Sequence, residues 1–324
     1  MPGAYGIVME NRKELVEKIL EMMMQGFYKN KGEWDREALH PHNPLSGVFY
    51  RGGNRIRLMY EVIENGYTDP RWATLKQYRE KGYYPKKGEH GVLCEKWILE
   101  KERTVKNEDG EWEIIKEPLE TPIVSYFKVF NAQQIQNFPE YKREMGEANY
   151  TDMIVGLKKS SECPIIEAGQ SRAYYSPSQD IIVLPPQMYF KDEISFLKTQ
   201  LHEMAHSTGH PTRLNREMKG RAEIESYAKE ELRAELGALF TETDLGVLLD
   251  AEHYEDHSDY LKSWNSILKQ DYNEFFRACA EAEKISQRLV SNYNRVMQIE
   301  PKVFTEIPKN TEKPLRIQQK HLRI

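Results

Sequence analysis

The chain contains a His-Glu-x-x-His motif, formed by His202, Glu203 and His206. In an α-helix, residues four apart lie on one face, so this spacing predicts a helix that carries the two imidazoles side by side. Two neutral imidazole nitrogens can fill two corners of a tetrahedral Zn²⁺ site. A carboxylate at Glu203 then lies beside a metal-bound water and can act as a general base in hydrolysis. The motif therefore predicts a zinc site with Glu203 as the catalytic residue.

The residues around the motif indicate a helix that packs on a core. Apolar side chains recur at helical spacing along residues 194–204, and the histidines lie beside this stripe. Gly209 and Pro211 follow and predict the end of the helix. The same motif can also arise by chance on an exposed charged helix. The apolar stripe favours the metal site over that alternative.

A third metal ligand has to come from another part of the chain. In the metzincin pattern a third histidine would fall on position 212, which here is Thr212. The next predicted helix, residues 226–238, carries Glu231 and Glu235 on one face. We expect Glu231 to be the third ligand, because small neighbouring residues let it approach the first helix closely. Glu235 is the alternative third ligand.

Other polar side chains near the motif have supporting roles or none. As a partner of a ligand, Glu235 is placed to hydrogen-bond a liganding imidazole and to fix its tautomer. His210, just after the first helix, is expected either to cap that helix or to hydrogen-bond a side chain that binds the metal. Glu230 is expected to be solvated, which is usual for one of two adjacent glutamates on a helix. A solvated acidic face is also the competing interpretation of Glu231 and Glu235.

Bulk properties limit the class of protein. A chain of 324 residues is long enough for two domains. Its three cysteines, Cys94, Cys163 and Cys279, form neither a disulfide framework nor a zinc ribbon and fit a reducing cytoplasm. No export signal is recognisable, and no apolar segment approaches membrane-spanning length. We therefore expect a cytoplasmic protein with no membrane association.

Residues 71–87 form a local basic and aromatic cluster. The net charge of -5 gives no global argument for nucleic-acid binding, but this segment interleaves lysines and arginines with tryptophan and tyrosines against the single acid Glu80. Aromatic faces can stack on unpaired bases while cations contact phosphates, as in proteins that bind single strands. The alternative is a solvated helix and hairpin whose aromatic residues belong to the core. The segment alone leaves both interpretations open.

Composition and periodicity predict an α+β fold in two domains. We expect a first α+β domain over residues 1–136, a linker over residues 137–150, a mostly helical domain over residues 151–300 and a tail over residues 301–324. In the helical domain, a strand, a turn and a second strand at residues 172–185 predict a small sheet just before the motif helix. Strand patterns in the first domain, separated by a charged and hairpin-like insertion at residues 100–120, lie at residues 92–99 and 122–130.

Several separate motifs together resemble ArdC-type antirestriction proteins. The likeness follows the family's order over roughly residues 10 to 300. In the first domain it rests on residues 43–47 (NPLSG), 50–54 (YRGGN), 69–74 (DPRWAT) and 87–89 (KGE). In the second domain it rests on residues 174–185, 202–210, 213–216 and 227–235. Two departures are Gly53, where an aliphatic residue is expected, and the long insertion after Leu99.

The resemblance implies a domain that binds single-stranded DNA, joined to a zincin-like metallopeptidase domain, in a protein carried by plasmids or other mobile elements. Such proteins shield incoming DNA from host restriction during conjugation. The resemblance also supports the DNA-binding interpretation of residues 71–87. We therefore expect DNA contacts from Tyr50, Arg51, Asn54, Arg71, Trp72, Lys76, Lys86 and Lys87.

Two other classes of function remain open. The chain can be a zinc endopeptidase of narrow specificity that cleaves a regulatory protein. It can also be a DNA-coating protein whose metal is purely structural. Replacing Glu203 and His202 separately distinguishes these classes, because only a hydrolase loses activity while its metal is retained.

Overall fold

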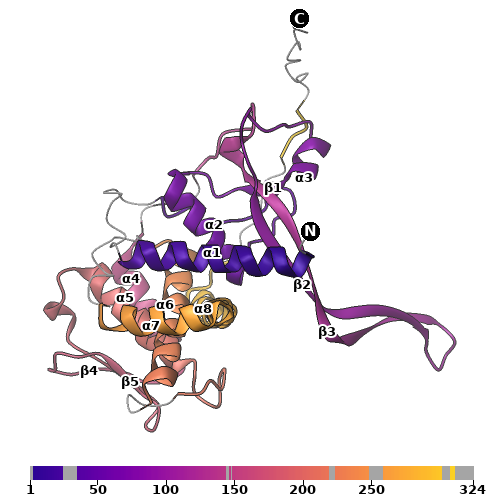
Figure 1. The fold of residues 1–324 in the computed structure, drawn as a ribbon. Coiled ribbons are helices and arrows are strands. Elements are labelled where there is room, and N and C mark those ends of the chain that lie inside the picture. The colour runs from indigo at the N-terminus through magenta and orange to yellow at the C-terminus, as the bar shows by residue number, and fades with distance from the viewer. Residues whose placement is uncertain are drawn as a thin grey trace, which may run out of the picture.

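The fold mixes helices with small sheets, as the sequence predicts. Figure 1 shows a helical body beside the N-terminal half of the chain, and a long two-stranded arm that projects away from both. No helix among the described residues is long and apolar enough to cross a membrane. The computed structural model describes residues 3–24, 35–143, 146, 148–218, 223–247, 258–300 and 307–310.

The N-terminal half contains a three-stranded antiparallel sheet of order β1-β3-β2, packed with helices. Thr74 caps the short helix α3 through a capping box with Gln77, which fixes the turn from β1 into that helix. The elements are α1 (Ala4–Met24), α2 (Gly52–Asn65), β1 (Trp72–Thr74), α3 (Leu75–Glu80), β2 (Val92–Lys106), β3 (Trp112–Asn131) and the 3-10 helix η2 (Ala132–Gln134).

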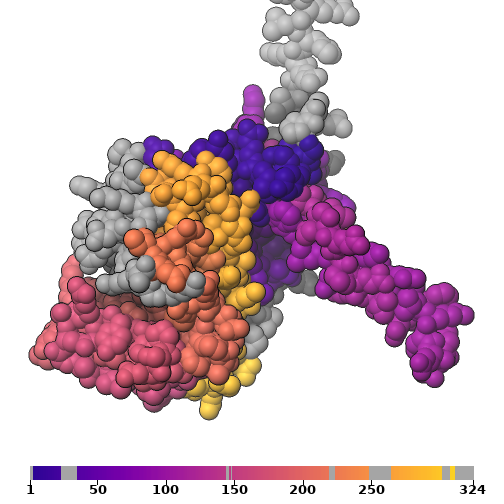
Figure 2. All heavy atoms as spheres, turned by 60° about the horizontal axis from the view of Figure 1, so that its bottom comes forward, coloured from indigo at the N-terminus to yellow at the C-terminus, as the bar shows by residue number. Residues whose placement is uncertain are grey.

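The projecting arm is the outer part of the β2 and β3 pair. The two strands pair from Val92 and Val129 in the body to Lys106 and Trp112 near the tip. Val129 is fully buried, whereas the side chain of Trp112 is 70% exposed. Figure 2 shows this segment standing clear of the rest of the molecule. The predicted insertion at residues 100–120 therefore continues both strands, with a shift in register after Ile98.

The second half is mostly helical and contains a small sheet of order β4-β6-β5. The predicted strand, turn and strand at residues 172–185 correspond to β5 and β6, and β5 is an edge strand. The elements are α4 (Tyr150–Ser160), β4 (Ile165–Glu167), β5 (Tyr174–Ser176), β6 (Ile181–Leu184), η3 (Gln187–Tyr189), α5 (Glu193–Ser207), α6 (Ile224–Leu245), α7 (Ser258–Gln270) and α8 (Tyr272–Met297).

The largest core cluster draws side chains from both halves of the chain. Leu39 and Ile56 from the N-terminal half pack in one cluster with Leu232 of α6 and Phe276 of α8. A separate cluster lies inside the helical body, between α4, β6, α5, α6 and α8. The predicted linker, residues 137–150, therefore connects two halves that share one hydrophobic core.

Gly53 has a packing role that explains one departure from the family pattern. A Cβ at this position would lie 2.4 Å from Cδ1 of Phe276, closer than Cβ atoms come to any neighbour. Because glycine has no side chain, α2 packs directly against this buried ring of α8. An aliphatic residue here would have to displace the ring, and overpacking of this kind typically costs about 1–3 kcal/mol.

Part of the predicted tail returns to the N-terminal half. Within the tail, the structure describes residues 307–310. The backbone N–H of Asn310 donates to the carbonyl of Lys81 at 2.8 Å. Ile307 packs against a small core cluster that includes Tyr78. This segment therefore brings the chain back from the end of α8 to the loop after α3.

Candidate functional site

The helix α5 carries both motif histidines in its last two turns. It begins after Asp192, whose side chain accepts a hydrogen bond from the backbone N–H of Ser195 at 2.8 Å. The apolar stripe predicted for residues 194–204 is largely buried, and Leu197 and Leu201 are completely covered. The helix is thus held against the core on one side, while its histidines face α6.

Small side chains let α6 approach α5 closely. Ala205 of α5 and Ala234 and Ala238 of α6 belong to the same core cluster and are almost fully buried. The distance between packed helices depends on the side chains at their contact, so alanines allow a short one. This short distance brings Glu231 and Glu235 of α6 to the two histidines.

The structure brings His202, His206 and Glu231 together in the geometry of a metal site. The Nε2 atoms of the two histidines lie 3.1 Å apart. The carboxylate oxygens of Glu231 lie 3.5 Å from Nε2 of His202 and 3.6 Å from Nε2 of His206. A tetrahedral ion with ligands at about 2.0–2.1 Å places those ligands about 3.3–3.4 Å from each other. The three side chains therefore fit a small divalent cation.

The second nitrogen of each imidazole faces another carboxylate of α6. Nδ1 of His202 lies 3.1 Å from Glu235, and Nδ1 of His206 lies 3.3 Å from Glu230. Carboxylates in these positions hold a proton on Nδ1 and leave Nε2 for a metal. The expectation that Glu230 is solvated is wrong, because this side chain is only 4% exposed. It is buried because the loop before α6 covers it and supplies the guanidinium of Arg216.

The carboxylates favour positive charge at the centre of this cluster. Burial opposes a charged imidazole, but hydrogen bonds with Glu231 and Glu235 outweigh burial and raise the pKa of His202 well above its usual range. Burial is likewise outweighed at His206, where Glu230 and Glu231 raise the pKa to about 9. For Glu231, burial opposes ionisation, yet the two imidazoles lower its pKa. An anionic donor set of this kind attracts a cation.

Glu203 lies on α5 next to His202 and is 7% exposed. Among the described residues, its carboxylate has no hydrogen-bond partner, in contrast to those of Glu230 and Glu235. A carboxylate that is not engaged by protein donors can accept a proton from a water molecule. The geometry is therefore compatible with the role of general base.

His210 lies beyond the end of α5. Among the described residues, it forms no hydrogen bond with a side chain of the candidate metal site. Its Nδ1 lies 2.8 Å from Oγ1 of Thr212, with which it forms a local turn. Its backbone N–H donates to the carbonyl of Ser207 at 3.1 Å, at the end of α5. The outer nitrogen of His206 faces Glu230 instead, so Glu230 has the partner role that was the other expectation for His210.

Two expected DNA contacts, Arg71 and Trp72, are buried. Trp72 is completely covered, and its ring packs edge-on against Tyr67 at 5.6 Å. Arg71 is 7% exposed and donates to both carboxylate oxygens of Asp69, at 2.9 and 2.7 Å. These positions correct the expectation of DNA contacts, because neither side chain is accessible to a strand. The tryptophan lies in β1, which pairs with β3, and its side chain belongs to the shared core cluster, so the core interpretation of this aromatic residue is the right one.

Tyr50 and Asn54 also have structural partners. The hydroxyl of Tyr50 donates to the carbonyl of Trp72 at 3.0 Å, and its ring packs against the shared core. Asn54 joins α2 to β2 through two hydrogen bonds with the backbone of Glu95, at 2.8 and 2.9 Å. Both residues therefore fix the fold of the N-terminal half. Arg51, between them, keeps a side chain that is 63% exposed.

The remaining expected DNA contacts, Lys76 on α3 and Lys86 and Lys87 in the loop after it, are exposed. The side chain of Lys76 is 86% exposed and lies 3.9 Å from Glu80. Arg79 of α3 is also exposed, although it is not among the expected DNA contacts. Tyr84, 37% exposed, adds a partly accessible ring. We call these residues, Lys76, Arg79, Tyr84, Lys86 and Lys87, the basic face.

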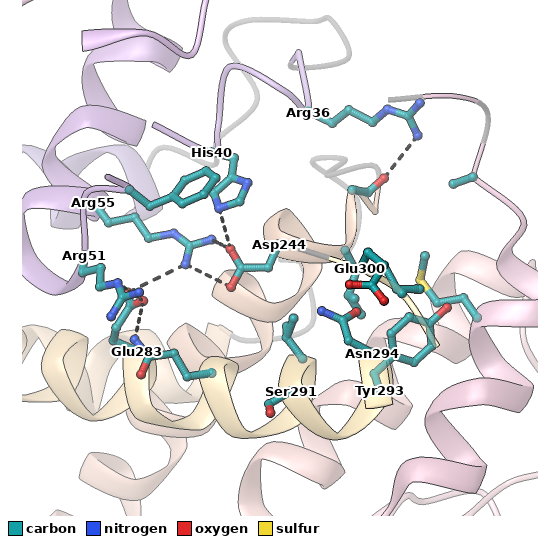
Figure 3. A pocket seen from close by; sticks show the side chains of 18 of the residues that line it. Arg36, His40, Arg51, Arg55, Asp244, Glu283, Ser291, Tyr293, Asn294 and Glu300 are labelled. Atoms are coloured by element: carbon teal, nitrogen blue, oxygen red, sulfur yellow. Dashed lines mark hydrogen bonds and ion pairs between the residues drawn. The ribbon is translucent and has the colours of Figure 1, made fainter. Parts of the chain in front are cut away.

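A groove of about 900 Å³ lies where the N-terminal half meets α6 and α8. Figure 3 shows Arg55 in its wall, between the carboxylates of Asp244 and Glu283. Nη2 of Arg55 lies 2.6 Å from Asp244, and Nε2 of His40 approaches the same carboxylate at 3.0 Å. Arg51 lies at the rim, 3.8 Å from Glu283. Because these charges pair with each other, the cluster fastens the two halves together.

Comparison with known proteins agrees with this architecture. A family model for the N-terminal domain of anti-restriction factor ArdC matches residues 9–130, and one for zincin-like metallopeptidases matches residues 157–281. The crystal structure of the antirestriction protein ArdC from plasmid R388, metal-free, superposes with a TM-score of 0.68 at 29% identity, over 88% of this chain and 98% of that one. The Mn(II)-bound structure of ArdC gives a TM-score of 0.66 at 29% identity, over 87% of this chain and 97% of that one.

Two kinds of relative match by sequence. DNA primase TraC of Escherichia coli is 32% identical over 298 residues, which are 88% of this chain. The chain spans only 27% of that protein and 20% of a second TraC. The protein y4eC of Sinorhizobium fredii, described as uncharacterized, is 30% identical over 247 residues, which cover 76% of this chain and 79% of y4eC.

The fold and the site define a zincin-like metallopeptidase domain joined to an ArdC-type N-terminal domain. The two family models together account for most of the chain, and the ArdC structures match it over nearly their whole length. The chain belongs to the ArdC-type antirestriction family.

Proposed function

We propose that this protein binds single-stranded DNA and protects incoming DNA of a mobile element from host restriction, with a zinc site that retains hydrolytic capacity. The observation that carries the proposal is the convergence of His202, His206 and Glu231, with Glu203 beside them, in an ArdC-type chain. A fold of this family without those side chains would support DNA binding alone. Their convergence supports a metal-dependent step as well.

In this proposal His202, His206 and Glu231 hold Zn²⁺, the ion for which two imidazoles and one carboxylate are a common hydrolytic set. When bound, the ion polarises a substrate carbonyl and makes water acidic. Glu203 accepts a proton at its carboxylate and passes it to the leaving group. Glu235 and Glu230 keep the two imidazoles oriented through their Nδ1 atoms.

The metal half of the proposal is tested with two variants of the full chain. We expect Glu203→Gln to keep bound zinc and His202→Ala to lose it, because only the histidine is a ligand. Metal content after dialysis measures both. A wild-type protein without bound zinc, or a His202→Ala protein with full metal content, would overturn the assignment. Restriction protection in the cell by each variant then shows whether hydrolysis contributes.

For DNA binding we propose the basic face, because its cations are exposed. For single strands, the logarithm of the affinity falls with the logarithm of the salt concentration with a slope of about -0.7 per neutralised phosphate. Replacement of Lys76 or Lys87 by serine should therefore weaken binding and make the salt dependence less steep. Lys101→Ser is the matched control, because Lys101 is 58% exposed but lies on the arm. Absent or salt-independent binding by the wild type contradicts the proposal.

One observation favours the second candidate function, a zinc endopeptidase of narrow specificity. The strand β5 is the edge of the small sheet and contacts α5, and its Tyr174 is 44% exposed. An edge strand offers free backbone groups that an extended peptide can pair with. If this function holds, restriction-proficient cells that produce the wild-type protein should cleave a protein that stays intact in cells that produce Glu203→Gln, as detected by comparing the two proteomes. Identical proteomes speak against it.

A further inference from the structure

A buried ion pair ends on one of the metal-site histidines. Nε and Nη2 of Arg216 donate to the two carboxylate oxygens of Glu230, at 3.0 and 2.7 Å. The same Glu230 Oε1 lies 3.3 Å from Nδ1 of His206. The side chains of Arg216 and Glu230 are 6% and 5% exposed. A two-point contact between a guanidinium and a carboxylate fixes the orientation of the carboxylate, and here that orientation decides how the imidazole is held.

Arg216 is also attached to the helix that carries the histidines. Its Nη2 donates to the carbonyl of Ala205 at 2.9 Å, and its Nη1 donates to Oγ1 of Thr208 at 2.7 Å. Both acceptors lie in the last turn and at the end of α5, where carbonyl groups lack partners within the helix. One guanidinium therefore connects the end of α5 to the carboxylate of Glu230 on α6.

The loop between the two helices is shaped to bring Arg216 to this position. The backbone N–H of Arg216 donates to the carbonyl of Gly209 at 3.0 Å, so the loop folds back on the end of α5. Asn215 adopts a φ of 48°, a left-handed conformation that asparagine tolerates better than most residues. A Cβ on Gly209 would lie 3.1 Å from Nη2 of Arg216 and 2.6 Å from Sδ of Met218. Glycine at this position leaves room for the guanidinium.

We propose that Arg216 is a positioning residue of the metal centre, which acts through Glu230 to hold the imidazole of His206 with its Nε2 directed at the ion. This inference rests on the proposed function of the site as a metal centre. The side chain of Arg216 donates hydrogen bonds to Glu230, Thr208 and Ala205, and to none of the three proposed metal ligands. Its effect is to restrict Glu230, which otherwise has freedom to rotate and to release the ring.

The same loop supplies a matched control in Arg213. Nε of Arg213 donates to the carbonyl of Ser207 at 2.7 Å, and its side chain is 4% exposed. It pairs with Asp180 and with the hydroxyl of Tyr175, so it anchors the loop to the small sheet. Arg213 thus resembles Arg216 in burial and in its contact with the end of α5. It differs in having no carboxylate that reaches a metal-site histidine.

The test measures Zn²⁺ affinity of the full chain by competition with a chelator. We expect Arg216→Ala and Glu230→Gln each to weaken binding by about tenfold to hundredfold, the usual effect of losing a partner of a ligand. Arg213→Ala should bind zinc as the wild type does. Arg216→Lys, which keeps the charge but cannot reach Glu230, Thr208 and Ala205 at once, should fall between the wild type and Arg216→Ala.

Two further readouts separate positioning from a general loss of stability. In the Co²⁺-loaded protein, the visible absorption bands should change in Arg216→Ala and in Glu230→Gln but not in Arg213→Ala, because they report the ligand field. The double variant Arg216→Ala, Glu230→Gln should bind Zn²⁺ no more weakly than the single variant with the lower affinity. The two substitutions are not additive, because Arg216 acts on His206 only through Glu230.

Equal losses of zinc affinity in Arg213→Ala and Arg216→Ala would overturn the inference, because loop anchoring would then explain both. Unchanged affinity in Arg216→Ala and Arg216→Lys would overturn it too. Failure of the wild-type protein to bind zinc would instead reject the proposed metal centre, on which the inference depends.

Discussion

At the scale of single residues, Asp244 shows how a buried charge links stability to pH. Burial opposes its ionisation, but Arg55 and His40 outweigh burial and lower the pKa of Asp244 below its ordinary value of 3.8. A carboxylate with a lowered pKa in the folded state stabilises the protein above the unfolded pKa, and this contribution is lost as the pH falls toward the folded pKa. The stabilisation is therefore complete near neutral pH.

We predict that Asp244→Asn lowers the free energy of unfolding by about 3 kcal/mol near neutral pH, because the buried Arg55 loses its nearer carboxylate partner and keeps only Glu283, 3.7 Å away. The difference from the wild type should shrink from about pH 5 to about pH 3 as the wild type loses its own contribution. Urea unfolding at a series of pH values measures this. A difference that does not depend on pH would show that the ion pair is not the cause.

The burial of Trp72 gives a second prediction at this scale. Trp72→Ala should destabilise the fold by about 3–5 kcal/mol, the usual cost of removing a large buried aromatic side chain. Tyr84→Ala, in the same basic and aromatic segment but 37% exposed, should change stability by less than about 0.5 kcal/mol. Thermal unfolding of both variants provides the measurement. Similar effects of the two substitutions would contradict the assignment of Trp72 to the core.

The sequence predicts metal ligands better than DNA contacts for a physical reason. The spacing of His202 and His206 is set by the helix itself, so the pattern determines the geometry without knowledge of the rest of the fold. Whether Trp72 faces a core or a strand of DNA depends on what packs over β1, which no local pattern contains. The buried role of Glu230 was missed for the same reason, since its partner Arg216 comes from a loop.

At the scale of elements, the β2 and β3 arm illustrates a feature that is only partly readable from sequence. Residues 92–99 and 122–130 are predicted as strands from their sequence patterns. The segment between them is charged and lacks a buried face. The sequence indicates a hairpin there, and the structure shows that this hairpin continues both strands of the body. Because the outer parts of β2 and β3 pair only with each other, this pairing buries little apolar surface.

We predict that the outer part of the arm can be removed without loss of stability. Replacing residues 100–121 by an Asn-Gly turn, which suits a two-residue hairpin, should change the free energy of unfolding by less than about 1 kcal/mol. The physical reason is that most of these side chains are exposed and none is buried. Chemical denaturation of the shortened chain measures the effect. A cooperative loss of several kcal/mol would show that the arm packs against the body.

At the scale of the whole molecule, composition and structure divide the chain differently. The polar segment at residues 137–150 looks like a linker because it lacks apolar periodicity. The structure shows that side chains before and after it, such as Ile56 and Phe276, share one core cluster. Contacts between segments more than two hundred residues apart leave no local trace in a single sequence. The two family models therefore match two separate segments of the chain, but the side chains of these segments pack into one core.

This shared core leads to a prediction about the isolated second half. A chain of residues 151–324 should not fold cooperatively, because it would expose apolar side chains of α6 and α8, including Leu232, Phe275 and Phe276, which are 2–5% exposed in the full chain. It would also leave Asp244 and Glu283 without Arg55. Near-ultraviolet circular dichroism, the sharpness of unfolding and the binding of a hydrophobic dye measure this. A matched chain of residues 35–324, which keeps α2 and most of the shared core, should retain a cooperative transition. If the shorter chain unfolds as sharply as this control, the two halves are independent domains despite their common core.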